Sequence, residues 1–95
     1  TYTFVLADAG DIVTSSNAAT VAMTIPPNSS VAFPIGSSIT VISIGAGLTN
    51  FAQGAGVTIT STGATAAAPI LRAQYSSATA IKTATDVWSV VGDIA

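Results

Sequence analysis

Frequent chain breaks limit every regular element of this sequence to a few residues. Glycine, proline and asparagine cluster at residues 26–28, 34–36, 45–47 and 54–56, and the runs between them are rich in Val, Ile and Thr. Proline lacks a backbone N–H and restrains the residue before it, so residues 26–28 and 34–36 cannot lie inside a sheet. Short β-branched runs between such breaks are typical of β-strands.

The predicted strands are short and numerous. Apolar residues alternate with small polar ones at Val21, Met23 and Ile25, and again at Ile39 and Val41. This period of two places one apolar face of each strand inward. We predict strands at residues 2–6, 11–14, 20–25, 30–33, 38–44, 49–52, 57–61, 70–76, 78–84 and 87–92.

Three connections follow from local turn chemistry. Thr85 and Asp86 predict the turn of a β-hairpin, because an Asp side chain can bond its own backbone in a turn. The two Gly-Ala-Gly segments at residues 45–47 and 54–56 are interpreted as hairpin ends, since two copies are too few for a solenoid repeat. Residues 62–68 are Ala-rich, with Gly63 near the start and Pro69 after the end, and are predicted to form a loop.

The length of 95 residues suffices for one domain, which we place at residues 1–95. Many short strands with closely spaced turn signals favour a sandwich or a barrel. We therefore predict an all-β fold, a compact antiparallel β-sandwich or jelly-roll-like barrel of about 8–10 short strands.

Charge is scarce, at 6% of residues with a net charge of -2, where a soluble domain usually carries about 25%. The absence of a basic patch argues against nucleic acid and against anionic membrane surfaces as partners. A neutral Thr-, Ser- and Ala-rich exterior has little electrostatic repulsion to keep copies apart, which favours self-association. The charged residues are Asp8, Asp11, Asp86, Asp93, Arg72 and Lys82.

Several residue types and segments are missing. The chain has no Cys and no His, which removes disulfides, thiol chemistry and the commonest metal ligand and general base. Its apolar runs are far shorter than the roughly 18 residues of a membrane helix. The chain begins at Thr1 without a charged and then apolar leader, so we expect no signal peptide and a processed product or fragment.

Candidate catalytic groups are weak. Asp8 and Asp11 bracket Gly10, and a turn is favoured over a Ca²⁺ site or an acid–base pair, because two carboxylates offer too few oxygens. A Ser nucleophile would need Lys82 as its base, but Thr79 occupies the Ser position of a Ser-x-x-Lys spacing. Arg72 and Lys82 are instead expected to meet Asp residues at a surface or subunit boundary. We predict no catalytic residue, no cofactor and no metal site.

Aromatic side chains supply the candidate anchors. Tyr2, Phe33, Tyr75 and Trp88 are predicted to pack in the core or at a subunit interface, because aromatic rings bury large areas in a small domain. The alternative is a sugar-stacking platform formed by Tyr2, Tyr75 and Trp88.

Segments spread over nearly the whole chain carry a family resemblance. They are Tyr-Thr-Phe-Val-Leu-Ala-Asp-Ala-Gly at residues 2–10, Ile-Pro-Pro-Asn-Ser-Ser-Val-Ala-Phe-Pro-Ile-Gly at 25–36, Gly-Ala-Gly-Val-Thr at 54–58, Leu-Arg-Ala-Gln-Tyr at 71–75, and Ala-Thr-Asp-Val-Trp at 84–88 followed by Gly-Asp at 92–93. Together they resemble a small β module of tailed-bacteriophage and prophage virion proteins, found in fibre-like and capsid-decoration proteins.

The resemblance implies a non-enzymatic viral structural protein on the particle surface, made in the cytoplasm of the bacterial host. It would serve as a capsid decoration or cement protein, a head-fibre module or a fibre segment. The implied partners are two further copies in a homotrimer and the major capsid or tail proteins.

Two other functions stay open at this point. The chain could be a tail-fibre tip that recognises a host cell-surface glycan through the loops at residues 26–29 and 62–68. An enzyme such as a depolymerase would require two of the four Asp side chains to meet in one cleft.

Overall fold

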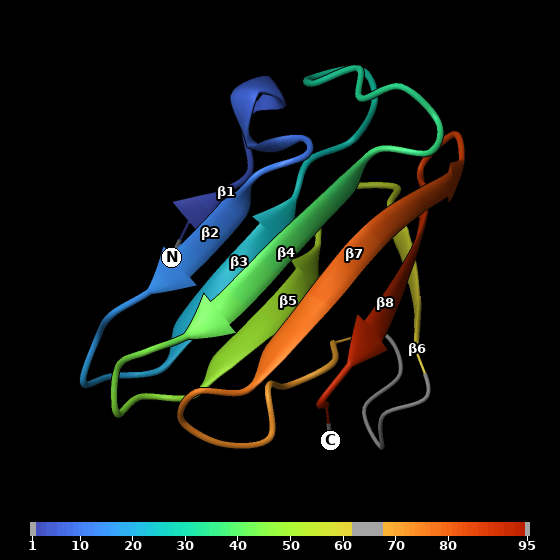
Figure 1. The fold of residues 1–95 in the computed structure, drawn as a ribbon. Coiled ribbons are helices and arrows are strands. Elements are labelled where there is room, and N and C mark those ends of the chain that lie inside the picture. The colour runs from blue at the N-terminus through green and yellow to red at the C-terminus, as the bar shows by residue number, and fades with distance from the viewer. Residues whose placement is uncertain (1, 62–67, 95) are drawn as a thin grey trace.

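Residues 2–61 and 68–94 are described by the computed structural model, and they form eight strands in two sheets with no α-helix. Figure 1 shows the two sheets one behind the other. The first sheet has the order β1-β3-β5, with β1 at Tyr2–Thr3, β3 at Val21–Ile25 and β5 at Thr49–Gln53. The second has the order β2-β4-β7-β8-β6, with β2 at Ile12–Ser15, β4 at Ser38–Ser43, β7 at Ser77–Ala84, β8 at Val87–Gly92 and β6 at Thr58–Ser61. The all-β prediction is confirmed.

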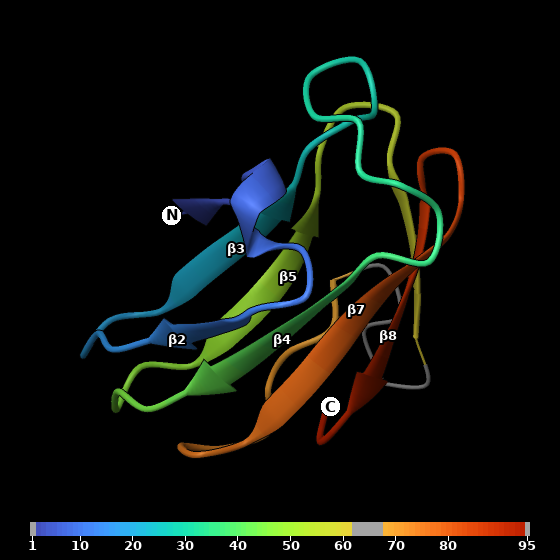
Figure 2. The same cartoon turned by 45° about the horizontal axis from the view of Figure 1, so that its top comes forward.

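From β1 to β6 the chain changes sheet at every connection, as Figure 2 shows for β2 to β5. After each strand in one sheet, the chain forms a strand in the other sheet and then returns. As a result, β1, β3 and β5 run parallel to one another, as do β2 and β4. Residue 12 lies opposite residue 40, and residue 21 lies opposite residue 49, so both pairs are 28 residues apart. The chain is therefore wound as a coil in which one turn is laid on the previous turn.

The C-terminal part of the second sheet is built differently. β7 and β8 form an antiparallel hairpin, β7 also pairs antiparallel with β4, and β6 pairs parallel with β8. Asp86 in the hairpin turn has a φ of 56°, in the left-handed region that Asp tolerates better than most residues. The turn predicted at Thr85 and Asp86 is confirmed.

The predicted strand directions are wrong in part. Four of the six pairings are parallel, so the sheets are mixed rather than antiparallel, and a jelly roll is not confirmed. The Gly-Ala-Gly segments are not hairpin ends, because the strands they join lie in different sheets. Alternation of apolar residues shows which face of a strand is buried and carries no information about its partner.

Three predicted strands also differ from the structure. Residues 30–33 form a turn and an extended loop instead of a strand, and Val31 donates its N–H to Pro27 O. Residues 70–76 make isolated bridges at Ile70 and Leu71 and then turn. The first strand ends at Thr3, because residues 6–8 form the 3-10 helix η1 (Leu6–Asp8). The loop predicted at residues 62–68 falls, up to residue 67, outside the described residues.

Both sheets contribute to one core. The predicted inward residues Met23, Ile25, Ile39 and Val41 are buried, which confirms the alternation. At the end of β4, the buried hydroxyl of Ser43 accepts a hydrogen bond from Thr49 at 3.3 Å, so this polar position is satisfied inside the core. The largest fully buried apolar side chains are Trp88, Phe4, Phe51, Ile25, Ile39, Leu71, Val41 and Val90.

Glycine is required where one crossing lies on another. A Cβ atom at Gly45 would lie 2.3 Å from Asn17 N, and one at Gly47 would lie 2.0 Å from Ala19 O. Both approaches are far shorter than a carbon atom tolerates against backbone. A Cβ at Gly54 would likewise lie 2.3 Å from Ile25 O. The Gly-Ala-Gly segments therefore allow the backbone of one turn of the coil to touch the backbone of the turn before it.

We predict that Gly47→Ala lowers the free energy of unfolding by about 1–3 kcal/mol, because the added methyl group overlaps Ala19 O and must displace backbone. Urea denaturation would measure the change. The neighbouring exposed Ala46 provides the control, since Ala46→Ser should leave the midpoint nearly unchanged. Equal midpoints for Gly47→Ala and the unmodified protein would contradict the stacked-crossing explanation.

Candidate functional site

The four predicted anchors separate into two pairs. Phe33 and Trp88 are 3% and 1% exposed, and their rings meet edge to face with centroids 5.3 Å apart. Both are therefore core residues. Tyr2 and Tyr75 are 36% and 72% exposed, so neither anchors the core, and an interface role for them stays a prediction. A sugar platform that includes Trp88 is wrong, because Trp88 has no exposed ring face.

Asp8 closes the turn at the start of the chain. Its Oδ2 accepts hydrogen bonds from the Tyr2 hydroxyl at 2.7 Å and from the Val5 N–H at 2.9 Å. The hydrogen bond to Asp8 raises the pKa of Tyr2, because the neutral phenol is the donor. Asp11 donates its backbone N–H to Asp8 O. The turn interpretation of Asp8 and Asp11 is confirmed.

Residues 2–61 and 68–94 contain no cluster of three metal-ligating side chains.

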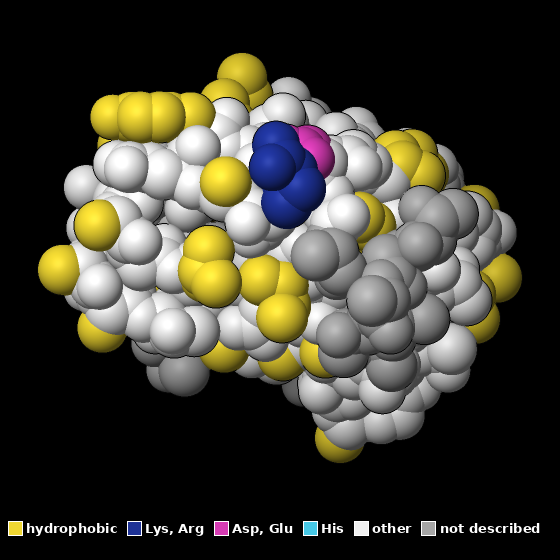
Figure 3. Space-filling model, turned by 90° about the horizontal axis from the view of Figure 1, so that it is seen from below, with side chains coloured by type: hydrophobic (Ala, Val, Ile, Leu, Met, Phe, Trp, Pro, Cys, Tyr) yellow, Lys and Arg dark blue, Asp and Glu magenta, His cyan; other side chains and the backbone are white. Residues whose placement is uncertain are grey.

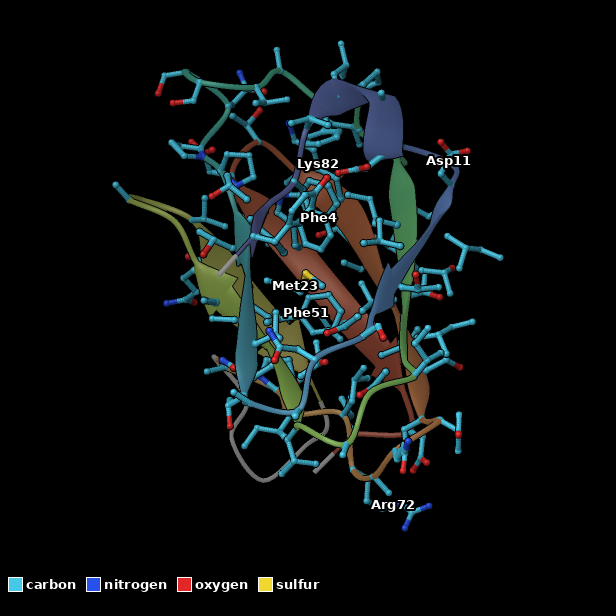
Figure 4. The ribbon with its side chains drawn as sticks, turned by 90° about the vertical axis from the view of Figure 1, so that its left-hand side faces the viewer. Phe4, Asp11, Met23, Phe51, Arg72 and Lys82 are labelled. Atoms are coloured by element: carbon cyan, nitrogen blue, oxygen red, sulfur yellow. The ribbon has the colours of Figure 1, made fainter. Side chains whose placement is uncertain are left out.

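Arg72 meets an Asp residue, as predicted. Its guanidinium donates two hydrogen bonds to Asp93, at 2.7 and 3.0 Å. Ser76 donates a third hydrogen bond to the same carboxylate at 2.7 Å. The hydrogen bond from Arg72, and after it the hydrogen bond from Ser76, hold the pKa of Asp93 below its ordinary value of 3.8. In Figure 4, Arg72 projects outward at the end of the molecule opposite Lys82.

Lys82 is where the structure departs most from expectation. Its side chain is 3% exposed and lies inside the sandwich, and no described carboxylate pairs with it. Its Nζ donates hydrogen bonds to Asn28 Oδ1 at 2.8 Å and to the backbone oxygen of Phe33 at 2.6 Å. The predicted Asp partner at a surface is wrong. The alternation of side chains along β7 was the signal that could have predicted a buried Lys82, because Ala78, Ala80 and Lys82 point the same way and are all buried.

The loop that carries Asn28 is fixed from the other side by Asp86. The carboxylate of Asp86 accepts a hydrogen bond from the Asn28 N–H at 2.7 Å. Asp86 lies in the β7–β8 turn, so this contact ties the Pro-Pro-Asn loop to the hairpin. Asn28 is thereby held by its backbone at Asp86 and by its side chain at Lys82. This cluster of Asn28, Phe33, Lys82 and Asp86 is the most chemically distinctive site among the described residues.

A second feature lies between the free edges of the two sheets. β1 and β2 each lie at the end of their sheet. A solvent-open recess of about 290 Å³ separates them, and the apolar residues that line it are Tyr2, Val13, Val21 and Met23. Met23 is a core residue, so the core comes close to solvent on this side.

Comparison with known proteins found no match among protein-family models, curated proteins or solved structures. The described residues contain no helix that has the length and apolar character to cross a membrane.

The lowered pKa of Asp93 predicts a pH-dependent stability. A carboxyl group whose pKa is lower in the folded state than in the unfolded state stabilises the fold at pH values above its unfolded-state pKa. This contribution is lost as the pH falls through the lower, folded-state pKa. Relative to the unmodified protein, Asp93→Asn should have a reduced Tm at neutral pH, and the difference should disappear well below pH 3.8. Thermal melts over this pH range measure it. Asp11→Asn, which removes an exposed carboxylate with no side-chain partner among the described residues, is the control; a pH-independent difference for Asp93→Asn would contradict the assignment.

Proposed function

We propose that this chain is a non-enzymatic structural domain of a bacteriophage particle, carried on the particle surface as a decoration, cement, head-fibre or fibre module. The sequence resemblance supports the phage context. The observation that supports a role in assembly is the surface, which combines very little charge with exposed apolar side chains.

The charge on the described surface is lower than the sequence suggests. Lys82 is buried, and the remaining cation, Arg72, is paired with Asp93. In Figure 3 the face seen from below shows one basic side chain beside one acidic one, among neutral and apolar atoms. Such a face offers little repulsion to another neutral surface. It suits contacts with copies of the chain or with other virion proteins.

Exposed apolar residues are distributed over both ends and the open side. Those near the free edge include Tyr2, Val5, Leu6 and Ile12, and those elsewhere include Ile35, Ile44, Leu48, Tyr75 and Val91. Ile12 lies on the edge strand β2 and is 64% exposed. An edge strand presents unpaired backbone groups, and with an apolar side chain it is well suited to add to another sheet. We propose that the copies in the homotrimer contact one another at the free sheet edges formed by β1 and β2.

The distribution of carboxylates supports a non-enzymatic role. Asp86 and Asp93 precede and follow β8, at its two ends. Asp8 is used in the first turn by Tyr2 and Val5, and Asp93 is used by Arg72 and Ser76. Asp86 and Asp93 are therefore separated by the length of β8, and the carboxylates of Asp8 and Asp93 are already held by neighbouring donors.

The glycan-binding alternative gains little from the structure. Of its two loops, residues 62–67 lie outside the described part. In the other, residues 26–29, the Asn28 side chain points to Lys82 rather than outward, which leaves Ser29 as the exposed polar residue.

We predict that mass spectrometry of purified phage particles from the source host will detect this chain at a copy number that matches shell or fibre symmetry. A host-cell fraction without particles serves as the control. Absence of the chain from intact particles would overturn the proposal.

We predict that the isolated protein is trimeric and that Ile12→Lys converts it to a monomer, because a charged edge residue blocks strand addition. Size-exclusion chromatography with light scattering gives the mass. Val91→Lys is the matched control, since Val91 is 50% exposed on β8, which lies inside the sheet. A monomeric unmodified protein, or a trimeric Ile12→Lys variant, would contradict the edge assignment.

A further inference from the structure

The buried amine of Lys82 lies against a carboxamide. Its Nζ is 2.8 Å from Asn28 Oδ1, and the amide carbon Cγ is one C=O bond beyond that oxygen. A C=O bond is about 1.23 Å long, so Cγ lies within about 4 Å of Nζ. This is close to the separation of about 3–3.5 Å at which bound groups react. A buried amine and a partly buried carboxamide are therefore held almost in contact.

The surroundings hold both groups in place. Lys82 lies on β7, a strand paired on both sides by β4 and β8. The Asn28 backbone is fixed by Asp86 at 2.7 Å, and a second acceptor, Phe33 O, lies 2.6 Å from Nζ. Lys82 is 3% exposed, so its amine is shielded from water, whereas Asn28 is partly buried. Such fixed positions supply the orientation that a reaction between two side chains needs.

We infer that Lys82 and Asn28 form an intramolecular isopeptide bond, a covalent modification site within this domain. The uncharged amine of Lys82 attacks Asn28 Cγ, the Nζ–Cγ bond forms, the Cγ–Nδ2 bond breaks, and one amine proton passes to Nδ2, which leaves as ammonia. When the same step is written from the ammonium form of Lys82, the leaving group departs as an ammonium ion. No oxidant, reductant or second reactant is consumed.

Burial provides the driving force. An ammonium group inside a protein without a carboxylate partner costs free energy, because its hydration is lost. The reaction replaces this cation with a neutral amide, and the charge departs with the leaving group. The new bond joins residues 28 and 82, so it also ties the Pro-Pro-Asn loop to the central strand β7 and restricts the unfolded chain. The inference goes beyond the proposed function and does not depend on it.

Intact-mass spectrometry and trypsin digestion of the denatured protein test the bond. Arg72 and Lys82 are the two basic residues, so an unlinked chain yields peptides 1–72, 73–82 and 83–95. The linked chain should be lighter by one ammonia and should resist cleavage after Lys82, because an acylated lysine is not a trypsin site. Residues 73–95 should then stay attached to residues 1–72 as one branched product.

Variants separate the bond from other losses of ammonia. A succinimide at Asn28 would also release ammonia, but it would leave position 82 cleavable and would persist in Lys82→Arg. We expect Lys82→Arg and Asn28→Ala to keep their full mass and Asn17→Ala to lose one ammonia. Folded, unmodified protein that retains its full mass after prolonged incubation at neutral pH and is cleaved after Lys82 would overturn the inference, as would ammonia loss without the branched product.

Discussion

Backbone touches backbone at Gly45, Gly47 and Gly54, where one turn of the coil crosses the previous one, and much of the architecture depends on this close approach. Gly45 lies against Asn17, and Gly47 lies against Ala19. Each glycine follows its contact by 28 residues, which is also the offset between paired residues of β3 and β5. The absence of side chains at these crossings lets the parallel strands come to pairing distance. Parallel pairing then brings Met23 opposite Phe51, and both side chains are buried in the core between the two sheets.

Lys82 is at odds with the rest of this core. β7 is otherwise a strand of small inward residues, with Ala78 and Ala80 leaving room for the facing sheet. The long lysine side chain reaches toward the end of the sandwich, where Asn28 and the carbonyl of Phe33 replace water around its amine. These contacts also place the Pro-Pro-Asn loop over that end.

Sequence reasoning recovered what depends on neighbouring residues. Strand content, inward faces such as that of Ile39 and Val41, and the turn at Asp86 all follow from local patterns. The partners of the strands in the coil did not follow, because the coil pairs residues 28 positions apart and alternation is the same for parallel and antiparallel neighbours. The site around Lys82 was missed because a charged residue is normally assigned to the surface, even where alternation points it inward.

The coil also constrains the order in which the chain can fold. β7 and β8 are the one pair of strands, among those described, that a tight turn joins directly, whereas each parallel pair must first close a long loop. Loop closure costs entropy before any contact is gained, so distant pairings form late. We expect the hairpin to nucleate the second sheet, β4 to join it and β2 to follow. This order runs from the C-terminus toward the N-terminus, opposite to the direction in which a ribosome delivers the chain.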